Sequence, residues 1–327
     1  MRARQAGLGV GTFEPGAHNA ITDVPGVRVG QTTLRREPDI HTGVTAIVPD
    51  RLPAGAGLFA GNGYGKLVGA TQIEELGVVE TPILLTATLS TFRVADALIT
   101  WMLARDPGLP SVNPVVGECN DGWLSDMRSR PITPEHVFAA LDSARTGPVE
   151  EGSVGAGTGT TALGFKAGIG TASRVVPVHD RPPVMVGALV QANFGGTLRV
   201  RAEQFPAGET IATSEHALLA AAGSPPDDGS CMIVVATDAR LDSRQLTRVA
   251  RRAVFALGRV GASYSHGSGD YGLAFSTAHE GETIPDVHLS PLFSATLDAV
   301  EEAVLNCLLA ADPTKGIDGH AAPAWRP

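Results

Sequence analysis

The chain has 327 residues, of which 43% are hydrophobic and 18% are charged. A chain of this length can bury about 75% of its unfolded surface, and its composition is typical of neither a disordered protein nor a membrane protein. The formal net charge of −9 argues against a nucleic-acid-binding surface, because binding to phosphates requires a basic patch.

Short apolar segments bounded by glycine, proline or aspartate predict β-strands, and segments with apolar residues three and four apart predict helices. In chain order, the predicted elements are strands at residues 44–48 and 83–87, helices at 91–104 and 136–144, strands at 184–192 and 232–237, a helix at 243–257, a strand at 271–276 and a helix at 291–311. Strands interleaved with helices indicate an α/β or α+β domain with layered sheets.

The cysteines and the amino terminus bear on the compartment. Cys119, Cys231 and Cys307 are odd in number and widely separated, which fits neither a disulfide framework nor a paired metal site and suits a reducing environment. The first residues contain no apolar stretch long enough for a signal sequence. We therefore expect a cytoplasmic protein.

Several familiar motifs are excluded by inspection. The glycine-rich segment 61–66 lacks the spacing and the hydroxyl residue of a phosphate loop, and segment 155–160 lacks the third glycine of a dinucleotide fingerprint. No serine occurs in a Gly-x-Ser-x-Gly pattern, and His279 has no second histidine four residues later. Nucleotide-binding, esterase and zinc-protease interpretations are all weakened.

The junction between Gly229 and Ser230 has a composition suited to self-cleavage. A polar loop, residues 223–229, runs directly into the predicted strand. The serine hydroxyl can attack the preceding carbonyl, which glycine leaves unshielded, and turn the peptide into an ester that water opens. The freed Ser230 then carries a nucleophile and an α-amine of reference pKa about 7.7–8.0 that can act as its base. On its own, Asp-Gly-Ser before a strand is more often a simple turn.

Seven blocks of sequence, in order, resemble the L-aminopeptidase/D-esterase and β-aminopeptidase family (DmpA-like), which also includes the nylon-oligomer hydrolases. The blocks are residues 19–30, 80–86, 152–159, 164–171, 190–195, 229–230 with 234–238, and 267–270. The resemblance covers nearly the whole chain.

This resemblance implies a single domain with a layered αββα fold, in which two β-sheets lie between helix layers as in amino-terminal nucleophile hydrolases. It also implies a precursor that cleaves itself before Ser230 into an α-chain of residues 1–229 and a β-chain of residues 230–327. The cleaved pairs are expected to stay associated and to assemble as homotetramers.

The resemblance assigns roles to five residues. Ser230 corresponds to the nucleophile, and Asn193 to an asparagine whose amide binds the oxyanion. Ser268 and Asp270 correspond to a pair that hydrogen-bonds the nucleophile and its amine, and Lys166 to a lysine that is catalytic in nylon-oligomer hydrolases. From the residues alone, Asn193 is a strand-end residue, Ser268 and Asp270 form a turn, and Lys166 is a solvated lysine.

Two departures from the family pattern concern the pocket. Some relatives have glutamate in place of Asp270. In block 117–123, relatives place an aromatic hydroxyl, whereas this chain has Asn120 and Trp123 and no tyrosine. We assign no role to Asn120 or Trp123 from sequence.

The sequence therefore predicts a self-cleaving aminopeptidase or amidase that acts on short peptides, amides or esters through an acyl-enzyme on Ser230. No metal, organic cofactor, nucleic acid or membrane partner is expected. A nylon-oligomer or polyamide hydrolase, an acyl transferase resembling ornithine acetyltransferase, and an unprocessed protein without activity are the alternatives.

Overall fold

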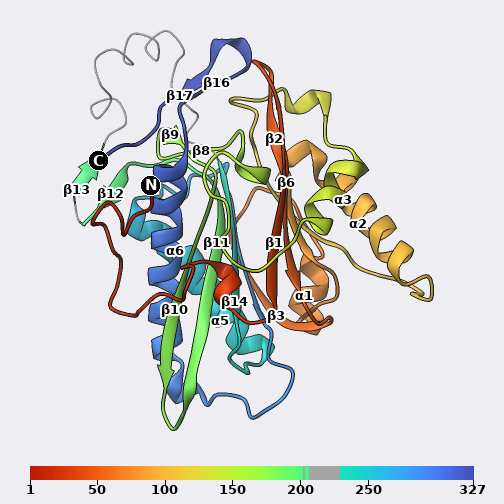
Figure 1. Ribbon diagram of the computed structural model, residues 1–327, viewed down its shortest axis with the longest axis vertical. Helices are drawn as coiled ribbons and strands as arrows, with labels where there is room; N and C mark the ends of the chain where they lie inside the picture. Colours follow the sequence, from red (N-terminus) through yellow and green to blue (C-terminus); the bar gives the residue numbers. More distant parts are fainter. Residues whose placement is uncertain (202, 206–228) are drawn as a thin grey trace.

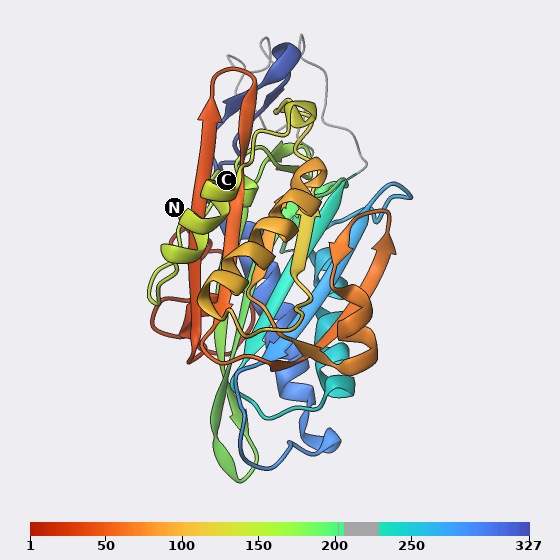
Figure 2. The ribbon, with the colours of Figure 1, turned by 90° about the vertical axis from the view of Figure 1, so that its right-hand side faces the viewer.

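Two mixed β-sheets pack face to face between two layers of helices (Figure 1, Figure 2). The computed structural model of the chain describes residues 1–201, 203–205 and 229–327. Most of the polar loop predicted before the cleavage junction, residues 223–228, lies outside the described residues, whereas Gly229 and Ser230 lie within them.

The first sheet has five strands in the order β1-β2-β6-β7-β4. They are β1 Val27–Arg36, β2 Ile40–Pro49, β6 Ile83–Ala87, β7 Val115–Cys119 and β4 Leu67–Val68. The second sheet has six strands in the order β10-β11-β14-β15-β3-β5. They are β10 Ile169–Val178, β11 Arg181–Asn193, β14 Ser230–Thr237, β15 Gly269–Ser276, β3 Ala54–Gly63 and β5 Val78–Val79. Short two-stranded ribbons pair β8 Thr161–Ala162 with β9 Phe165–Lys166, β12 Leu198–Val200 with β13 Glu203–Phe205, and β16 Thr314–Lys315 with β17 Ala321–Ala322.

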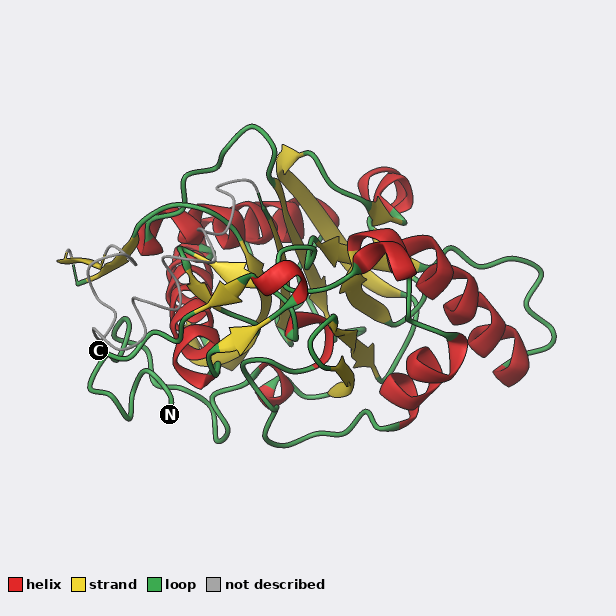
Figure 3. Cartoon of the chain, turned by 90° about the horizontal axis from the view of Figure 1, so that it is seen from above, coloured by secondary structure: helices red, strands yellow, loops and turns green. Residues whose placement is uncertain are grey.

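Helices cover the outer face of each sheet (Figure 3). α2 Thr91–Arg105 and α3 Pro134–Asp142 pack on the first sheet, and α5 Ser243–Leu257 and α6 Ser290–Ala310 pack on the second. The short helix α1 Ala70–Leu76 lies against β3. No helix in the described part of the chain combines the length and the apolar character needed to span a membrane.

Three apolar clusters fill the spaces between the four layers. The side chains of β14 belong to two of these clusters. Cys231, Ile233 and Val235 join the cluster beneath the helices α5 and α6, whereas Met232, Val234 and Ala236 join the cluster between the two sheets. Successive side chains of a strand point to opposite faces, so an uninterrupted apolar run is what a strand buried on both faces requires. The predicted αββα sandwich is confirmed.

All nine predicted elements are present, and their bounds differ from the predicted ones by at most four residues. The helix predicted at residues 136–144 is α3, which begins at Pro134 and ends at Asp142. Proline at the first helical position has a backbone φ already suited to a helix, and the main-chain N–H of Thr133 is bonded by His136 Nδ1 at 3.1 Å. The helix therefore starts two residues earlier than its apolar periodicity indicates.

The segments before and after the predicted cleavage junction share the second sheet. β14 and β15, both after Gly229, lie between β11 and β3, which come before it. β14 pairs with β11 and β15 pairs with β3 along most of their lengths. Neither segment can complete this sheet without the other.

Candidate active site

Ser230 is the first residue of the central strand β14, where the register places two other predicted site regions beside it. It pairs with Asn193 at the end of β11 on one side and with Gly269 at the start of β15 on the other. The side chain is 3% exposed. The nucleophile predicted from sequence therefore lies on a rigid strand end, flanked by the predicted oxyanion-binding residue and by the Ser268–Asp270 segment.

The peptide group between Gly229 and Ser230 is held from both sides. The Gly229 carbonyl oxygen accepts a hydrogen bond from the main-chain N–H of Gly269 at 3.0 Å. A Cβ atom placed on Gly229 would lie 2.1 Å from the Asn193 carbonyl oxygen, which is far inside van der Waals contact. Only glycine fits at this position without displacing β11.

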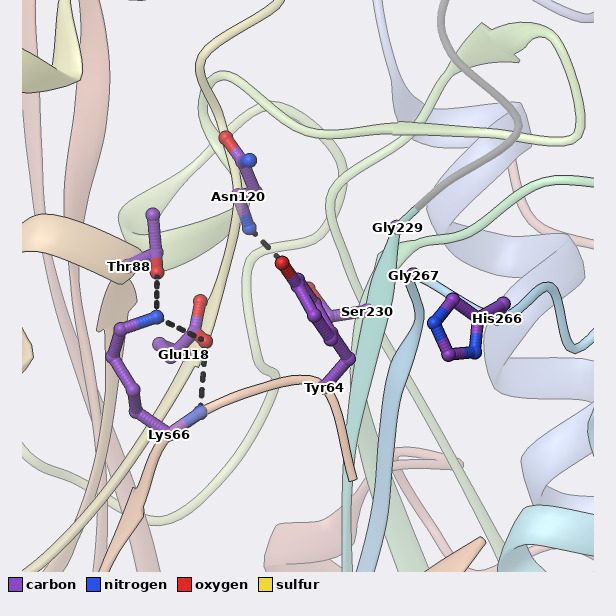
Figure 4. A pocket seen from close by; sticks show the side chains of 9 residues that line it. All are labelled: Tyr64, Lys66, Thr88, Glu118, Asn120, Gly229, Ser230, His266 and Gly267. Carbon is purple, nitrogen blue, oxygen red and sulfur yellow. Dashed lines mark hydrogen bonds and ion pairs between the residues drawn. The ribbon is translucent and has the colours of Figure 1, made fainter. Parts of the chain in front are cut away.

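The Ser230 hydroxyl opens on a cavity of about 480 Å³ between the two sheets (Figure 4). Its oxygen accepts a hydrogen bond from the main-chain N–H of Asn120 at 3.3 Å. The cavity is lined by Tyr64, Lys66, Thr88, Glu118, Asn120, Gly229, Ser230, His266 and Gly267. A nucleophile, a carboxylate and an ammonium group thus share one solvent-accessible space.

Asn193 is buried, with its side-chain amide oriented by the ribbon strand β8. Its Oδ1 accepts a hydrogen bond from the main-chain N–H of Thr161 at 3.1 Å. Because the oxygen is engaged by a donor, the Nδ2 group is the part of the amide left to donate. A neutral donor beside Ser230 is the kind of group that stabilises developing negative charge on an oxyanion.

Ser268 and Asp270 form a hydrogen-bonded pair at the start of β15, the strand next to Ser230. Ser268 Oγ donates to Asp270 Oδ1 at 2.9 Å, and both side chains are buried. Asp270 Oδ2 has no hydrogen-bond partner within the described ranges. Burial raises the pKa of Asp270 to about 6, although the hydrogen bond from Ser268 acts in the opposite direction. Within the described part of the chain, the Ser230 hydroxyl accepts its hydrogen bond from Asn120 and not from this pair.

Lys166 does not line the cavity, and it is not a solvated lysine. Its side chain is completely buried, and Nζ donates to the carbonyl oxygens of Gly157, Thr160 and Ala167 at 3.2, 2.9 and 2.6 Å. Burial lowers the pKa of Lys166 to about 7. Its ammonium group therefore ties together the segment that leads into Thr161 and hence to Asn193.

Among the cavity residues that the sequence analysis did not identify, two form an ion pair. Glu118, next to the end of β7, is 3% exposed, and burial raises its pKa. Lys66 follows β3 in the glycine-rich segment 61–66, and its Nζ lies 3.6 Å from Glu118 Oε1. Glu118 could have been found, because it precedes Asn120 in block 117–123, which was already associated with the pocket. Nothing in the sequence shows that segment 61–66, which contains Lys66, lies beside that block.

The two residues left without a role have different positions. Asn120 lines the cavity and binds the Ser230 hydroxyl through its backbone. Trp123 instead stacks on His320 at 3.8 Å between ring centroids, and its Nε1 donates to the Ala321 carbonyl oxygen at 3.1 Å. The aromatic side chain of this block thus anchors the carboxyl-terminal ribbon.

Comparison with known proteins identifies the family. The profile described as Peptidase family S58 matches residues 19–322, which is most of the chain. The chain belongs to peptidase family S58. It is also 40% identical over 351 aligned positions to the β-peptidyl aminopeptidase BapA of Sphingosinicella microcystinivorans, an alignment that covers 98% of this chain and 88% of that protein.

Solved structures of this S58 family share the fold. A β-aminopeptidase from Burkholderia sp. is 38% identical, with a TM-score of 0.87 and full coverage of both chains. The L-aminopeptidase D-Ala-esterase/amidase of Ochrobactrum anthropi, a prototype of the serine aminopeptidases with a variant Ntn hydrolase fold, is 35% identical with a TM-score of 0.88, covering 99% of this chain and 95% of that one. These findings confirm the predicted family and identify a serine-type aminopeptidase.

Proposed function

We propose that the chain cleaves itself before Ser230 and then removes amino-terminal residues, including β-amino residues, from short peptides, amides or esters through an acyl-enzyme on Ser230. The observation that carries the proposal is the position of the Gly229–Ser230 junction. A hydroxyl, its preceding carbonyl and a donor to that carbonyl meet at the wall of a cavity that has room for a substrate.

Self-cleavage follows from the groups around the junction. Ser230 Oγ attacks the Gly229 carbonyl carbon, and the negative charge that develops on the Gly229 oxygen is stabilised by the N–H of Gly269, 3.0 Å away. Collapse of this intermediate breaks the bond to the Ser230 nitrogen, which takes up the proton released by the hydroxyl and becomes an amine. Water then hydrolyses the ester, giving a carboxylate on Gly229 and a free hydroxyl on Ser230.

The same hydroxyl then serves the aminopeptidase reaction. Before cleavage the Ser230 nitrogen belongs to a peptide bond and cannot accept a proton, whereas afterwards it is an amine that can. The amine takes the hydroxyl proton as Oγ attacks the substrate carbonyl, and it returns a proton to the leaving amine. Asn193 Nδ2 donates to the oxyanion, and Asp270, ionised above pH about 6, holds the amine in place.

Glu118 provides the acceptor that an aminopeptidase needs for the substrate's amino group. Its Oε1 accepts from the Lys66 main-chain N–H at 3.0 Å. Its Oε2 is buried without a hydrogen-bond partner among the described residues. A buried carboxylate oxygen of this kind is strongly stabilised by binding an ammonium group. Lys166, which lies outside the cavity, would act by positioning Asn193.

After cleavage we expect the two polypeptides to remain together. The shared second sheet joins them, as does a buried ion pair between Arg174 Nη2 and Glu302 Oε2 at 2.6 Å. Assembly of the cleaved pairs into homotetramers, and a cytoplasmic location, are further parts of the proposal; they are supported by the family resemblance and by three buried free cysteines.

Ser230→Ala tests the proposal directly, with Ser111→Ala, at an exposed serine that does not line the cavity, as the matched control. We expect Ser230→Ala to remain a single polypeptide and to lose turnover of aminoacyl p-nitroanilides, whereas Ser111→Ala is cleaved and active. Full activity in Ser230→Ala would refute the assignment of the nucleophile.

A further inference from the structure

The wall of the cavity beside Ser230 carries a positive and a negative group side by side (Figure 4). Lys66 Nζ donates to Thr88 Oγ1 at 2.7 Å and lies 3.6 Å from Glu118 Oε1. The Lys66 main-chain N–H bonds the same carboxylate oxygen at 3.0 Å. Two contacts therefore engage Glu118 Oε1, whereas Oε2 is buried and makes no hydrogen bond among the described residues.

Lys66 also has donor capacity to spare. An ammonium group has three N–H bonds, and the contacts with Thr88 and Glu118 account for two directions. The Lys66 side chain is 40% exposed, in contrast to 3% for Glu118. The cavity wall thus carries one cationic donor and, next to it, a carboxylate with one unpaired oxygen.

This pairing is poorly suited to a substrate whose only charge is an ammonium group. Such a group bound at Glu118 would lie close to the Lys66 cation, and like charges at short range repel. The other acidic groups that interact with this region are Asp270 and Asp121, both buried. Neither lines the cavity, so neither supplies a second carboxylate at its wall to balance both Lys66 and a bound ammonium group. A ligand that brings its own carboxylate gives each charge a partner.

We propose that the cavity selects acyl groups that carry an ammonium and a carboxylate on the same carbon atom, as in an aspartyl residue linked through its β-carboxyl group. Glu118 binds the ammonium group, and Lys66 binds the neighbouring carboxylate. The inference rests on the proposed function, in which Ser230 attacks the carbonyl of a β-amino residue.

The chemical class follows from the adjacency of the two protein charges. A β-aspartyl group places its ammonium and carboxylate on one carbon and its reactive carbonyl one methylene away. It is therefore a β-alanyl group with one added carboxylate. Attack of Ser230 Oγ on that carbonyl forms an ester and releases the amine with a proton, and water then releases free aspartate.

A matched pair of substrates tests the inference on the wild-type, self-processed protein. β-Aspartyl p-nitroanilide and β-alanyl p-nitroanilide differ only in the carboxylate, and the compound with that carboxylate converted to a carboxamide controls for size. We expect kcat/KM to be at least about tenfold higher for the β-aspartyl compound, mainly through KM, because a charged hydrogen bond is gained.

Equal or faster turnover of the β-alanyl compound would overturn the inference while leaving the proposed function in place. Turnover of neither compound by protein that is cleaved before Ser230 would count against both. The two failures are therefore distinguishable in one experiment.

Substitution of Lys66 sharpens the test. Lys66→Met should reverse the ranking of the two substrates. The β-aspartyl carboxylate loses its cationic partner, and the β-alanyl ammonium group is no longer repelled by a lysine. Lys66→Arg should keep the original ranking. Lys315→Met, at an exposed lysine, is the matched control. An unchanged preference in Lys66→Met would contradict the assignment.

Inhibition by the product amino acid tests the inference without a β-aspartyl substrate. L-Aspartate should inhibit the wild-type protein competitively at concentrations about tenfold lower than β-alanine does, and Lys66→Met should abolish that difference. Equal inhibition of the wild-type protein by the two amino acids would contradict the proposed zwitterion site.

Discussion

Lys66 and Lys166 differ in almost everything except residue type. Lys166 is completely buried and donates to three main-chain carbonyl oxygens, whereas Lys66 is 40% exposed at the cavity wall beside a buried carboxylate. Family resemblance singled out Lys166, and Lys66 lay in a segment noted only for failing a nucleotide-binding pattern. The comparison shows that the partners of a lysine, more than its place in a motif, decide what it can do.

The regions around Lys166 and Lys66 contribute to different steps of the proposed reaction. The segment held by Lys166 leads through Thr161 to Asn193, which we propose binds the oxyanion. The Lys66 region presents Glu118, which we propose binds the substrate's amino group. Changes in the first region should therefore affect the chemical step, and changes in the second should affect substrate binding.

The largest expected effect is on the oxyanion side. Asn193→Ala should lower kcat by about 10²–10³-fold, because one preorganised donor to the developing charge is lost, with a smaller change in KM. Steady-state kinetics on the cleaved protein measures both. An effect confined to KM would place Asn193 in substrate binding instead.

A smaller effect is expected on the binding side. Glu118→Gln should raise KM for aminoacyl p-nitroanilides by about 10–100-fold, because a charged hydrogen bond to the substrate's amino group is lost. Self-cleavage should persist, since that reaction involves no substrate amino group. If kcat alone fell, the proposed role of Glu118 would be wrong.

Lys166→Met should act on stability. Carbonyl oxygens left without a donor cost about 1–3 kcal/mol, so the free energy of unfolding should fall by about that amount, as measured in urea. Lys315→Met, the exposed control, should change it by less than about 0.5 kcal/mol. Equal effects of the two substitutions would remove the structural role of Lys166.

The last effect, which is small for each pH unit, is a pH dependence. Lys166 has a pKa of about 7 in the folded chain, below its ordinary value of 10.5. Between these values the unfolded chain binds more protons at this residue, so its contribution to stability improves as pH rises and is constant below pH about 7. The unfolding free energy of the wild type should increase relative to Lys166→Met by up to about 1.4 kcal/mol per pH unit. Parallel curves for the two proteins would contradict the shift.

Much of the fold was predictable because its strongest signals are local. Apolar runs gave β6, β14 and β15, and capping residues gave α5, in which Asp242 Oδ1 accepts from the Gln245 N–H at 2.7 Å. β3 was missed because its glycines have low strand propensity. They are needed for packing, since a Cβ on Gly57 would lie 2.2 Å from the Thr247 nitrogen of α5.

The site was predictable in part, and for a different reason. Resemblance supplied Ser230, Asn193, Ser268 and Asp270, which the strand register of β11, β14 and β15 brings to neighbouring positions; their roles stay predictions. Glu118 and Lys66 were not found, because their meeting depends on β4 and β7 pairing across the first sheet. Long-range pairing of this kind leaves no local pattern in the sequence.

The central claim is that one residue supplies both the nucleophilic hydroxyl and the amine that serves as its base. Intact-mass measurement of purified, active protein tests it most directly. The account predicts two polypeptides of 229 and 98 residues whose masses together exceed that of the 33.7 kDa chain by one water, with the acyl group of a slow ester substrate attached to the shorter one. A single full-length mass from fully active protein, or acylation of the longer polypeptide, would contradict it.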